Sequence, residues 1–458
     1  MILKMAKTGK AIDMTKGPIF GPLIRFILPM IGGSVFQQLY NTVDFIFVGN
    51  VMDKTAAAAV GASATLINVT IGLFTGISVG TTVVAAQAIG SGRDDIGRKA
   101  LHTSVAFGLI GGILLLLLGG FFAPNILQLL NTPATVMPQA VTYIRIYLIS
   151  VPMLVFYNMV SGSFRAEGDS STPFTVLVIC GLLNVVFDAL FMIVIPLGVA
   201  GAAIATTFTQ GLSALLIGLF ARRPSRRLRL SAREIRIDKE ILIKVLKIGL
   251  PTGIQTIIIT FSNIIVQFYI NGFGDTAVAA FATYYKVENL NFLAILAFGQ
   301  ASTAFAGQNM GAGEYRRIRK GSLILTFTGA VIVLCVSGAI LFFSGTVFRW
   351  FMKDPEVIRN AVSLAMVSFP FYWIYPAIEV FGGAVRAMGH ALTSMFIIIA
   401  NMCVVRITLL AAFSKNIGTL QSIAAVYPIT WATAAACFTV AFFLFLRPHL
   451  QKNSETGG

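Results

Sequence analysis

Two short polar patterns in apolar surroundings could bind a cation or carry a proton. In QQLYNTVDFIFVG, Gln37, Asn41 and Asp44 follow one another at i, i+4 and i+7, so they share one face of a helix. In GLLNVVFDALF, Asn184 and Asp188 are four residues apart and share a face in the same way. Their oxygens suit a hard monovalent cation such as Na⁺. Buried carboxylates close to one another can equally hold a proton at physiological pH.

The segments that carry these patterns read as membrane-spanning. Hydrophobic residues make up 56% of the 458-residue chain and charged residues only 11%, more apolar surface than a soluble fold could bury. Twelve apolar runs, between residues 26 and 446, are each about 20 residues or longer, enough to cross about 30 Å of hydrocarbon. A charge at the bilayer centre costs about 3 kcal/mol, so a carboxylate there is expected to be functional. We therefore predict an all-α polytopic membrane protein.

The basic residues predict how the chain is oriented. Of 34 lysines and arginines, the loops on one side of the membrane hold only Lys54, Arg349, Lys353, Arg359 and Lys415. Basic loops stay in the cytoplasm, so both termini are predicted to be cytoplasmic. The most basic run, RRPSRRLRLSAREIR at 222–236, is then a cytoplasmic linker, which we expect to lie against anionic lipid head groups.

The two halves of the chain repeat each other. Pro29 and Asn41 align with Pro251 and Asn263, AAQAIGSG precedes a basic helix as AGQNMGAG does, and FRAEGD aligns with VRAMGH. Three pairs of landmarks in the same order indicate an internal repeat of six spans. An even number of spans makes the repeats parallel, related by a pseudo-two-fold axis along the membrane normal, as in transporters. We predict an N-terminal lobe at 1–221, the linker at 222–242 and a C-terminal lobe at 243–458.

A depth estimate brings four residues of the first lobe together. At 1.5 Å per residue from each span's midpoint, Asp44, Asp188, Thr206 and Tyr143 fall at roughly 6 to 9 Å on the outer side. They could converge on one coupling site. In the second half Val266 stands opposite Asp44, so that half does not duplicate the site.

The second half has intramembrane charges of its own. Lys286 and Glu288 lie close together in the eighth span, and they either neutralise each other or face a polar cavity. Glu379 and Arg386, at i and i+7, form either a structural ion pair or part of the transport path. Glu288 and Glu379 are therefore candidates for the substrate cleft, together with Gln37 and Asn41.

Matched prolines predict where the spans could bend. Pro29 in span 1 and Pro251 in span 7 occupy equivalent positions, as do Pro152 and Pro370 in spans 4 and 10. A proline inside a helix removes a backbone hydrogen bond and allows a kink. Pro29 and Pro251 are the hinge candidates.

Several other functions are disfavoured. The basic charge falls in short loops rather than on a soluble face, which argues against a nucleic-acid partner. The sequence lacks HExxH and P-loop motifs, and we expect neither an enzyme nor an organic cofactor. The cysteines lie in apolar runs and lack CxxC spacing, which argues against a disulfide framework or a metal cluster. They are Cys180, Cys335, Cys403 and Cys437. A channel would need a symmetric ring of polar residues, which the unequal halves do not provide.

The motifs PMIGGSVFQQLYNTVDFIFVG, RAEGDSSTPF, NVVFDALFMIVIPLGVAGAAIAT and GQNMGAG resemble those of the multidrug and toxic compound extrusion (MATE) transporters. The similarity covers essentially the whole chain in family order, and LYNxxD is closest to the DinF-like bacterial and archaeal branch. Ala189 follows Asp188 where the family often has proline. The NorM-type branch relies on second-lobe acids, to which Glu379 does not match residue by residue.

The resemblance implies two six-helix lobes and export of amphipathic, cationic drugs by antiport with H⁺ or Na⁺ through alternating access. Its cation site would comprise Asp44, Asn184, Asp188 and Thr206, with Tyr143 close by. It implies a monomer in the lipid bilayer of a bacterial or archaeal cytoplasmic membrane, with a role in antibiotic resistance. The alternative is a flippase for a lipid-linked precursor, which the acidic and aromatic cleft candidates disfavour.

Overall fold

The structure, a computed structural model, describes residues 11–52 and 54–455, with the side chains of a few helical positions, Asn41 and Asp44 among them, outside that description. The described residues form helices and no β-strand. Twelve of their helical stretches are long and apolar enough to cross a membrane, as the sequence predicts. This confirms the expected all-α polytopic membrane protein.

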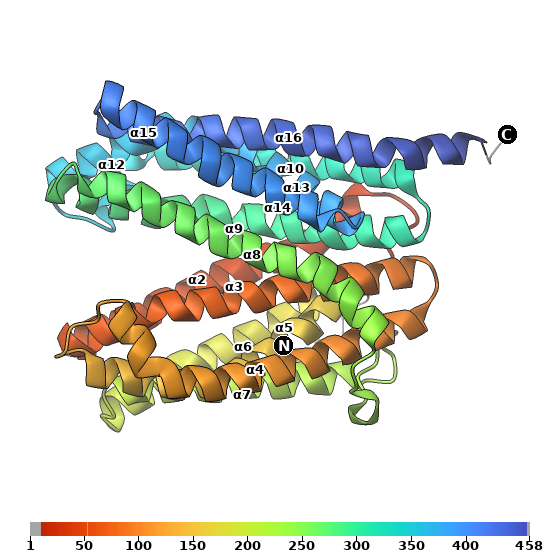
Figure 1. The fold of residues 1–458 in the computed structure, drawn as a ribbon, viewed down its shortest axis with the longest axis horizontal. Helices are drawn as coiled ribbons and strands as arrows, with labels where there is room; N and C mark the ends of the chain where they lie inside the picture. The colour runs from red at the N-terminus through yellow and green to blue at the C-terminus, as the bar shows by residue number, and fades with distance from the viewer. Residues whose placement is uncertain (1–10, 53, 456–458) are drawn as a thin grey trace. The chain divides into compact units, whose positions relative to one another are not determined.

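The chain divides into two compact units (Figure 1). The first contains residues 11–13 and Leu28–Gly253, and the second contains Met14–Ile27 and the chain from Ile254 onward. The helices of the first unit are α3 (Lys54–Gly90), α4 (Asp94–Leu129), α5 (Met137–Ala166), α6 (Ser171–Ala189), the π-helix η1 (Leu190–Val194), α7 (Val199–Ala221) and the short 3₁₀-helix η2 (Ala232–Glu234).

The second unit repeats this pattern with more interruptions. Its helices are α9 (Asp275–Gly311), α10 (Tyr315–Phe342), α11 (Ser344–Arg349), α12 (Pro355–Ser368), the 3₁₀-helix η3 (Phe369–Ile374), α13 (Tyr375–Ala387), α14 (Ala391–Ile398), the π-helix η4 (Ile399–Val405), α15 (Arg406–Asn416) and α16 (Leu420–Glu455). Paired turns of the two repeats share a left-handed glycine, with φ of 72° at Gly92 and 74° at Gly313. Only glycine adopts this φ without strain, so the repeated GSG and GAG sequences produce the same turn.

Two helices belong partly to each unit. Helix α2 (Phe20–Val51) changes from the second unit to the first between Ile27 and Leu28, next to Pro29. Helix α8 (Lys239–Asn271) changes from the first to the second after Gly253, two residues beyond Pro251. Both hinge candidates therefore lie where a continuous helix passes from one unit to the other.

The first half of α8 packs on α3 through glycines. A Cβ added to Gly76 would lie 2.2 Å from the backbone nitrogen of Gly253, and one added to Gly80 would lie 2.3 Å from the carbonyl oxygen of Val245. Each helix contributes a Gly-x-x-x-Gly pair, Gly249 being the fourth member. Small residues at this spacing let two membrane helices approach closely.

The basic linker folds back onto the first unit. Arg226 pairs with Glu167 at 2.8 Å and with Asp169 at 2.7 Å, and the Leu228 N–H donates to Glu167 Oε1 at 2.8 Å. Arg227 pairs with Asp94 at 2.7 Å. Protein carboxylates therefore provide the counter-charge of Arg226 and Arg227, and the contact of the run with lipid head groups stays a prediction.

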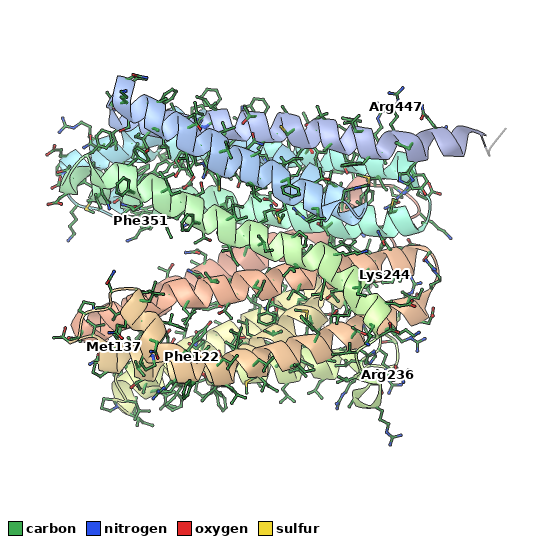
Figure 2. The ribbon with its side chains drawn as sticks, viewed as in Figure 1. Phe122, Met137, Arg236, Lys244, Phe351 and Arg447 are labelled. Carbon is green, nitrogen blue, oxygen red and sulfur yellow. The ribbon has the colours of Figure 1, made fainter. Side chains whose placement is uncertain are left out.

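The remainder of the linker is fixed by backbone hydrogen bonds. His102 Nε2 accepts from the Ser231 N–H at 2.9 Å, and Thr103 Oγ1 accepts from the Asp238 N–H at 3.1 Å. These contacts fix the segment that leads into α8. In Figure 2, Arg236 and Lys244 lie at the end of the first unit opposite Phe122.

Candidate functional site

Four of the five predicted coupling residues lie on three neighbouring helices of the first unit. Helices α5, α6 and α7 pack on one another, and the Phe187 and Phe208 rings, 4.7 Å apart, join α6 to α7. The Thr207 hydroxyl donates to the Ile146 carbonyl at 3.1 Å and joins α7 to α5. This packing fixes the helix faces from which the candidate side chains project.

Asn184 and Asp188 are both buried on α6. Asn184 is only 4% exposed and Asp188 only 2%, although the helix is otherwise apolar. Asn184 Nδ2 has no hydrogen-bond partner among the described residues. A buried polar pair of this kind is costly in a membrane protein, which makes it a candidate site.

The helix geometry changes directly after Asp188. The α-helix ends at Ala189 and continues as the π-helix η1, in which the Ile195 N–H reaches the Leu190 carbonyl at 2.8 Å. Such π-turns occur frequently at functional sites, because they shift the side chains beyond them. Ala189, where proline was expected from the resemblance, is thus followed by a π-turn.

The other first-unit candidates lie on adjoining helices. Tyr143 is buried on α5 and stacks on Tyr147 with the ring centroids 6.1 Å apart, and Thr206 is half-buried on α7. The Thr206 hydroxyl donates to the Ala202 carbonyl at 3.0 Å, which leaves its oxygen able to accept or coordinate. Thr206, Asp188 and Asn184 each offer an oxygen of the kind that suits Na⁺, on the adjoining helices α6 and α7.

The predicted residues of α2 are described less completely. Gln37 is exposed, whereas the side chains of Asn41 and Asp44 lie outside the described residues. Arg145, a basic residue within α5, donates from Nε to the Gly120 carbonyl of α4 at 3.1 Å. This hydrogen bond joins the Arg145 side chain to α4.

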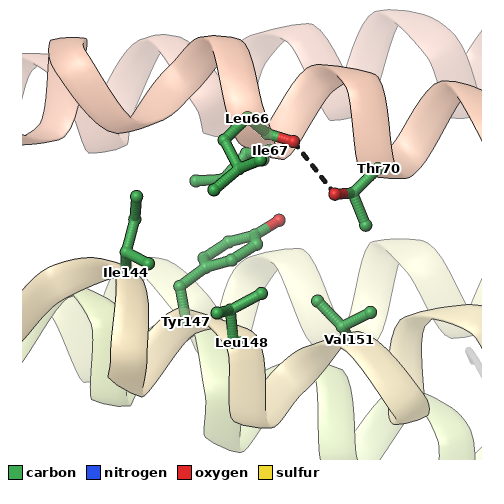
Figure 3. Close-up of a pocket in the computed structure, with 7 residues that line it drawn as sticks. All are labelled: Leu66, Ile67, Thr70, Ile144, Tyr147, Leu148 and Val151. Carbon is green, nitrogen blue, oxygen red and sulfur yellow. Dashed lines mark hydrogen bonds between the residues drawn. The ribbon is translucent and has the colours of Figure 1, made fainter. Parts of the chain in front are cut away.

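A small cavity lies between α3 and α5 (Figure 3). Its volume of about 10 Å³ holds about one water molecule, far less than a drug needs. Its lining is mostly apolar, with Thr70 and Tyr147 as the polar members beside Leu66, Ile67, Ile144, Leu148 and Val151. It is not the substrate site.

Glu288 of the second unit is the centre of a tyrosine cluster. The residue is 8% exposed on α9, and the hydroxyls of Tyr372 and Tyr284 both donate to its Oε1, the latter at 3.4 Å. Tyr284 also contacts Ser368 Oγ at 2.9 Å. Lys286 points to the exposed side of the helix, so the suggestion that Lys286 neutralises Glu288 is wrong.

Sequence reasoning missed these tyrosines. Tyr284 and Glu288 are at i and i+4, a signal that could have been used. Tyr372 comes from the 3₁₀-helix η3, which begins beside Pro370. Its approach to Glu288 depends on how distant segments pack, and no local pattern reveals it.

Glu379 and Arg386 form an ion pair within α13, with 4.0 Å between Oε2 and Nη2. A Cβ on Gly299 would lie 2.8 Å from Glu379 Oε2, so the carboxylate would have to shift if that residue of α9 carried a side chain. The Arg386 Nη1 also donates to Ser394 at 3.3 Å. These contacts match the structural alternative for the pair.

The chain is similar in sequence to known transporters. The sequence profile of the MatE family matches residues 29–190 and 251–411, one block in each half of the chain. The chain is 30% identical over 412 residues to a probable multidrug resistance protein, YpnP, of Bacillus subtilis strain 168, covering 89% of this chain and 92% of that protein. It is 23% identical over 435 residues to a FAD transporter of Shewanella oneidensis, covering 93% and 95% of the two chains.

Solved structures show the same fold. An outward-facing multidrug resistance transporter of the MATE family and MOP superfamily superposes with a TM-score of 0.91. The match covers 96% of this chain and 99% of the other, at 22% sequence identity.

Proposed function

Because this chain belongs to the MatE family, we propose that it is a secondary active exporter that exchanges amphipathic, cationic organic compounds for H⁺ or Na⁺. One observation carries the proposal: the almost fully buried pair of Asn184 and Asp188 inside an apolar helix. YpnP, to which the chain is 30% identical, is itself described as a probable multidrug resistance protein.

The coupling step is a change of charge at the first-unit carboxylates. Uptake of H⁺ or Na⁺ by Asp188, and by Asp44 on α2, neutralises a buried negative charge. Asn184, Thr206 and Tyr143 supply further oxygens around it. Removing one buried charge is worth several kcal/mol, which is enough to reverse a two-state balance.

The conformational step takes place in α2 and α8. Each passes from one compact unit to the other beside a proline, at Pro29 and Pro251. Bending at these points would move the units while the chain remains continuous. This is the form that alternating access takes in our proposal.

We place the protein in the cytoplasmic membrane as a monomer, with both termini and the 222–242 linker in the cytoplasm. The positive charge of the linker and of the terminal segments supports this orientation. A lipid-precursor flippase remains the alternative. The FAD transporter of Shewanella oneidensis is a relative whose named substrate is anionic, so anionic cargo occurs among similar chains.

Ethidium efflux from proteoliposomes tests the proposal. A pH gradient and a Na⁺ gradient are imposed separately, with the dissipated gradient as control. We expect efflux above that control under at least one gradient. Ethidium movement that is independent of both gradients contradicts antiport, and no movement under any condition contradicts the multidrug assignment.

A further inference from the structure

A positive charge is buried in the second unit at a point that the coupling site does not use. Arg406 is the first residue of α15, directly after the π-helix η4, and is 3% exposed. It lies within the apolar stretch Ala391–Asn416, one of the twelve membrane-spanning segments. A guanidinium in that environment requires compensation.

The compensation it receives is incomplete. Nη1 donates to Asn263 Oδ1 at 3.3 Å and to Ser262 Oγ at 3.4 Å, and Nη2 contacts only the Met402 sulfur, a weak acceptor, at 2.8 Å. Nε has no acceptor among the described residues. The ion pairs among those residues do not include Arg406, whose charge interacts with the Glu288 carboxylate only at longer range.

Arg406 and Asn263 lie in the second-half counterparts of the spans that carry the polar residues of the first half. Asn263 lies 222 residues after Asn41, and Arg406 lies within one residue of the position that aligns with Asn184 at the repeat offset of 221 or 222. Leu409 stands roughly opposite Asp188. The second unit therefore carries a guanidinium in the region where the first carries an amide and a carboxylate.

Tyrosines lie beside Arg406 and beside its partner Asn263. Asn263 Nδ2 donates to the hydroxyl of Tyr285 at 3.2 Å, and Tyr285 is 38% exposed. On the inner side the Arg406 guanidinium lies 4.9 Å from the centroid of the Tyr427 ring. The hydroxyl of Tyr427 is buried and has no partner among the described residues. An anion that displaced the Asn263 amide would meet Nη1 and Nε, with aromatic rings beside it.

We infer that Arg406 is the group through which the second unit recognises a carboxylate on an aromatic, zwitterionic substrate. One guanidinium neutralises one negative charge, whereas a phosphate or pyrophosphate would leave excess charge in the apolar segment. The flanking tyrosines suit the flat apolar part of such a molecule. This inference names a substrate class and rests on the proposed export function.

Two dyes that differ in one group provide the test. Rhodamine 110 carries a free carboxylate, and rhodamine 123 is its methyl ester, with the same cationic ring system. Gradient-driven efflux of both is measured from proteoliposomes, and the ratio of rhodamine 110 to rhodamine 123 is the readout. The variants are Arg406→Gln and Arg406→Lys, with Arg145→Gln as the control for loss of another arginine within a span.

We expect wild type to export both dyes and Arg406→Gln to lower the ratio about tenfold or more, the usual effect of losing a charged hydrogen bond. Arg406→Lys keeps the charge and should give an intermediate ratio, and Arg145→Gln should keep the wild-type ratio. If Arg406→Gln does not fold, the wild type and Arg406→Lys still give the comparison.

Two results overturn the inference. One is a wild type that exports rhodamine 123 but not rhodamine 110. The other is a ratio in the Arg406 variants that stays within about twofold of wild type, which would make Arg406 structural. If wild type exports ethidium but neither rhodamine, the inference alone fails. If wild type exports neither the rhodamines nor ethidium under any gradient, the proposed function fails and the inference fails with it.

Discussion

Acidic side chains of this chain have different roles because their neighbours differ. Glu167 and Asp169 lie at the end of α5 and beyond it, where Arg226 of the linker pairs with both. Asp188 lies instead beside an amide, Asn184, within an apolar helix. The first pair fixes a loop, and for the second we propose exchange of a cation.

Glu167 gives a pH dependence whose sign can be stated. Burial raises the pKa of its carboxyl above the ordinary 4.5, although Arg226 and the Leu228 N–H oppose the shift. Between 4.5 and the raised pKa the folded protein binds more protons than the unfolded chain, so stability falls as pH rises through that window. In Glu167→Gln this fall should be smaller.

Melting temperatures in detergent from about pH 4.5 to about pH 8 measure that difference. Glu240→Gln, at an exposed position outside the linker contacts, is the matched control and should keep the wild-type slope. Identical slopes for wild type and Glu167→Gln would show that this carboxyl does not contribute.

Residue-level prediction from sequence succeeds where the contact is local. The i, i+4 spacing of Asn184 and Asp188 places them on one face, and both are buried in α6. Arg406 was recognisable as a charge within a span, but its partner Asn263 is 143 residues away. Contacts at that separation follow from tertiary packing, which one sequence does not reveal.

At the scale of helices, the close crossing of α3 and α8 depends on glycine. Gly76 and Gly80 of α3 meet Gly249 and Gly253 of α8 at distances that leave no room for a Cβ. The sequence predicts both spans. It does not show whether a glycine pair packs on another helix or faces lipid, because the residues are the same in both cases. The sequence also did not reveal the π-helices η1 and η4 or the 3₁₀-helix η3. One added or missing residue per turn barely changes the hydrophobic pattern.

Gly76→Ala should destabilise the protein. The new methyl would lie 2.2 Å from the Gly253 nitrogen, and overpacking of this kind costs about 1–3 kcal/mol. Gly120→Ala in α4 is the control, because its Cβ has nothing within 4 Å and alanine favours a helix more than glycine does. A thermal unfolding assay in detergent should show a lower melting temperature for Gly76→Ala only. Equal melting temperatures for the two variants would refute the close crossing.

At the scale of the whole molecule, the sequence predicts most of the architecture. Twelve spans, the internal repeat and the family all follow from hydropathy and paired motifs, and the structure and comparisons confirm them. The division of α2 and α8 between two units was not foreseen, because both read as uninterrupted apolar runs. The docked linker was also missed, since Arg226 and Arg227 look like any other members of a basic run.

The orientation of the molecule stays a prediction with a direct test. Cysteines introduced at Ser225 and Lys415, both exposed, should react oppositely with an impermeant thiol reagent in intact cells. Lys415 should label from outside, and Ser225 only after the membrane is opened. Labelling of Ser225 in intact cells would reverse the proposed topology.

Ethidium efflux by Asp188→Asn, in proteoliposomes under imposed pH and Na⁺ gradients, tests the central claim most directly. The asparagine mimics the neutral carboxyl permanently, so the variant should elute as a folded protein yet lose gradient-driven efflux at least about tenfold, as Asp44→Asn should too. Asp275→Asn, an exposed aspartate at the start of α9, should transport at the wild-type rate. Efflux by Asp188→Asn at the wild-type rate, with the same pH and Na⁺ dependence, would contradict the role of this carboxylate in coupling.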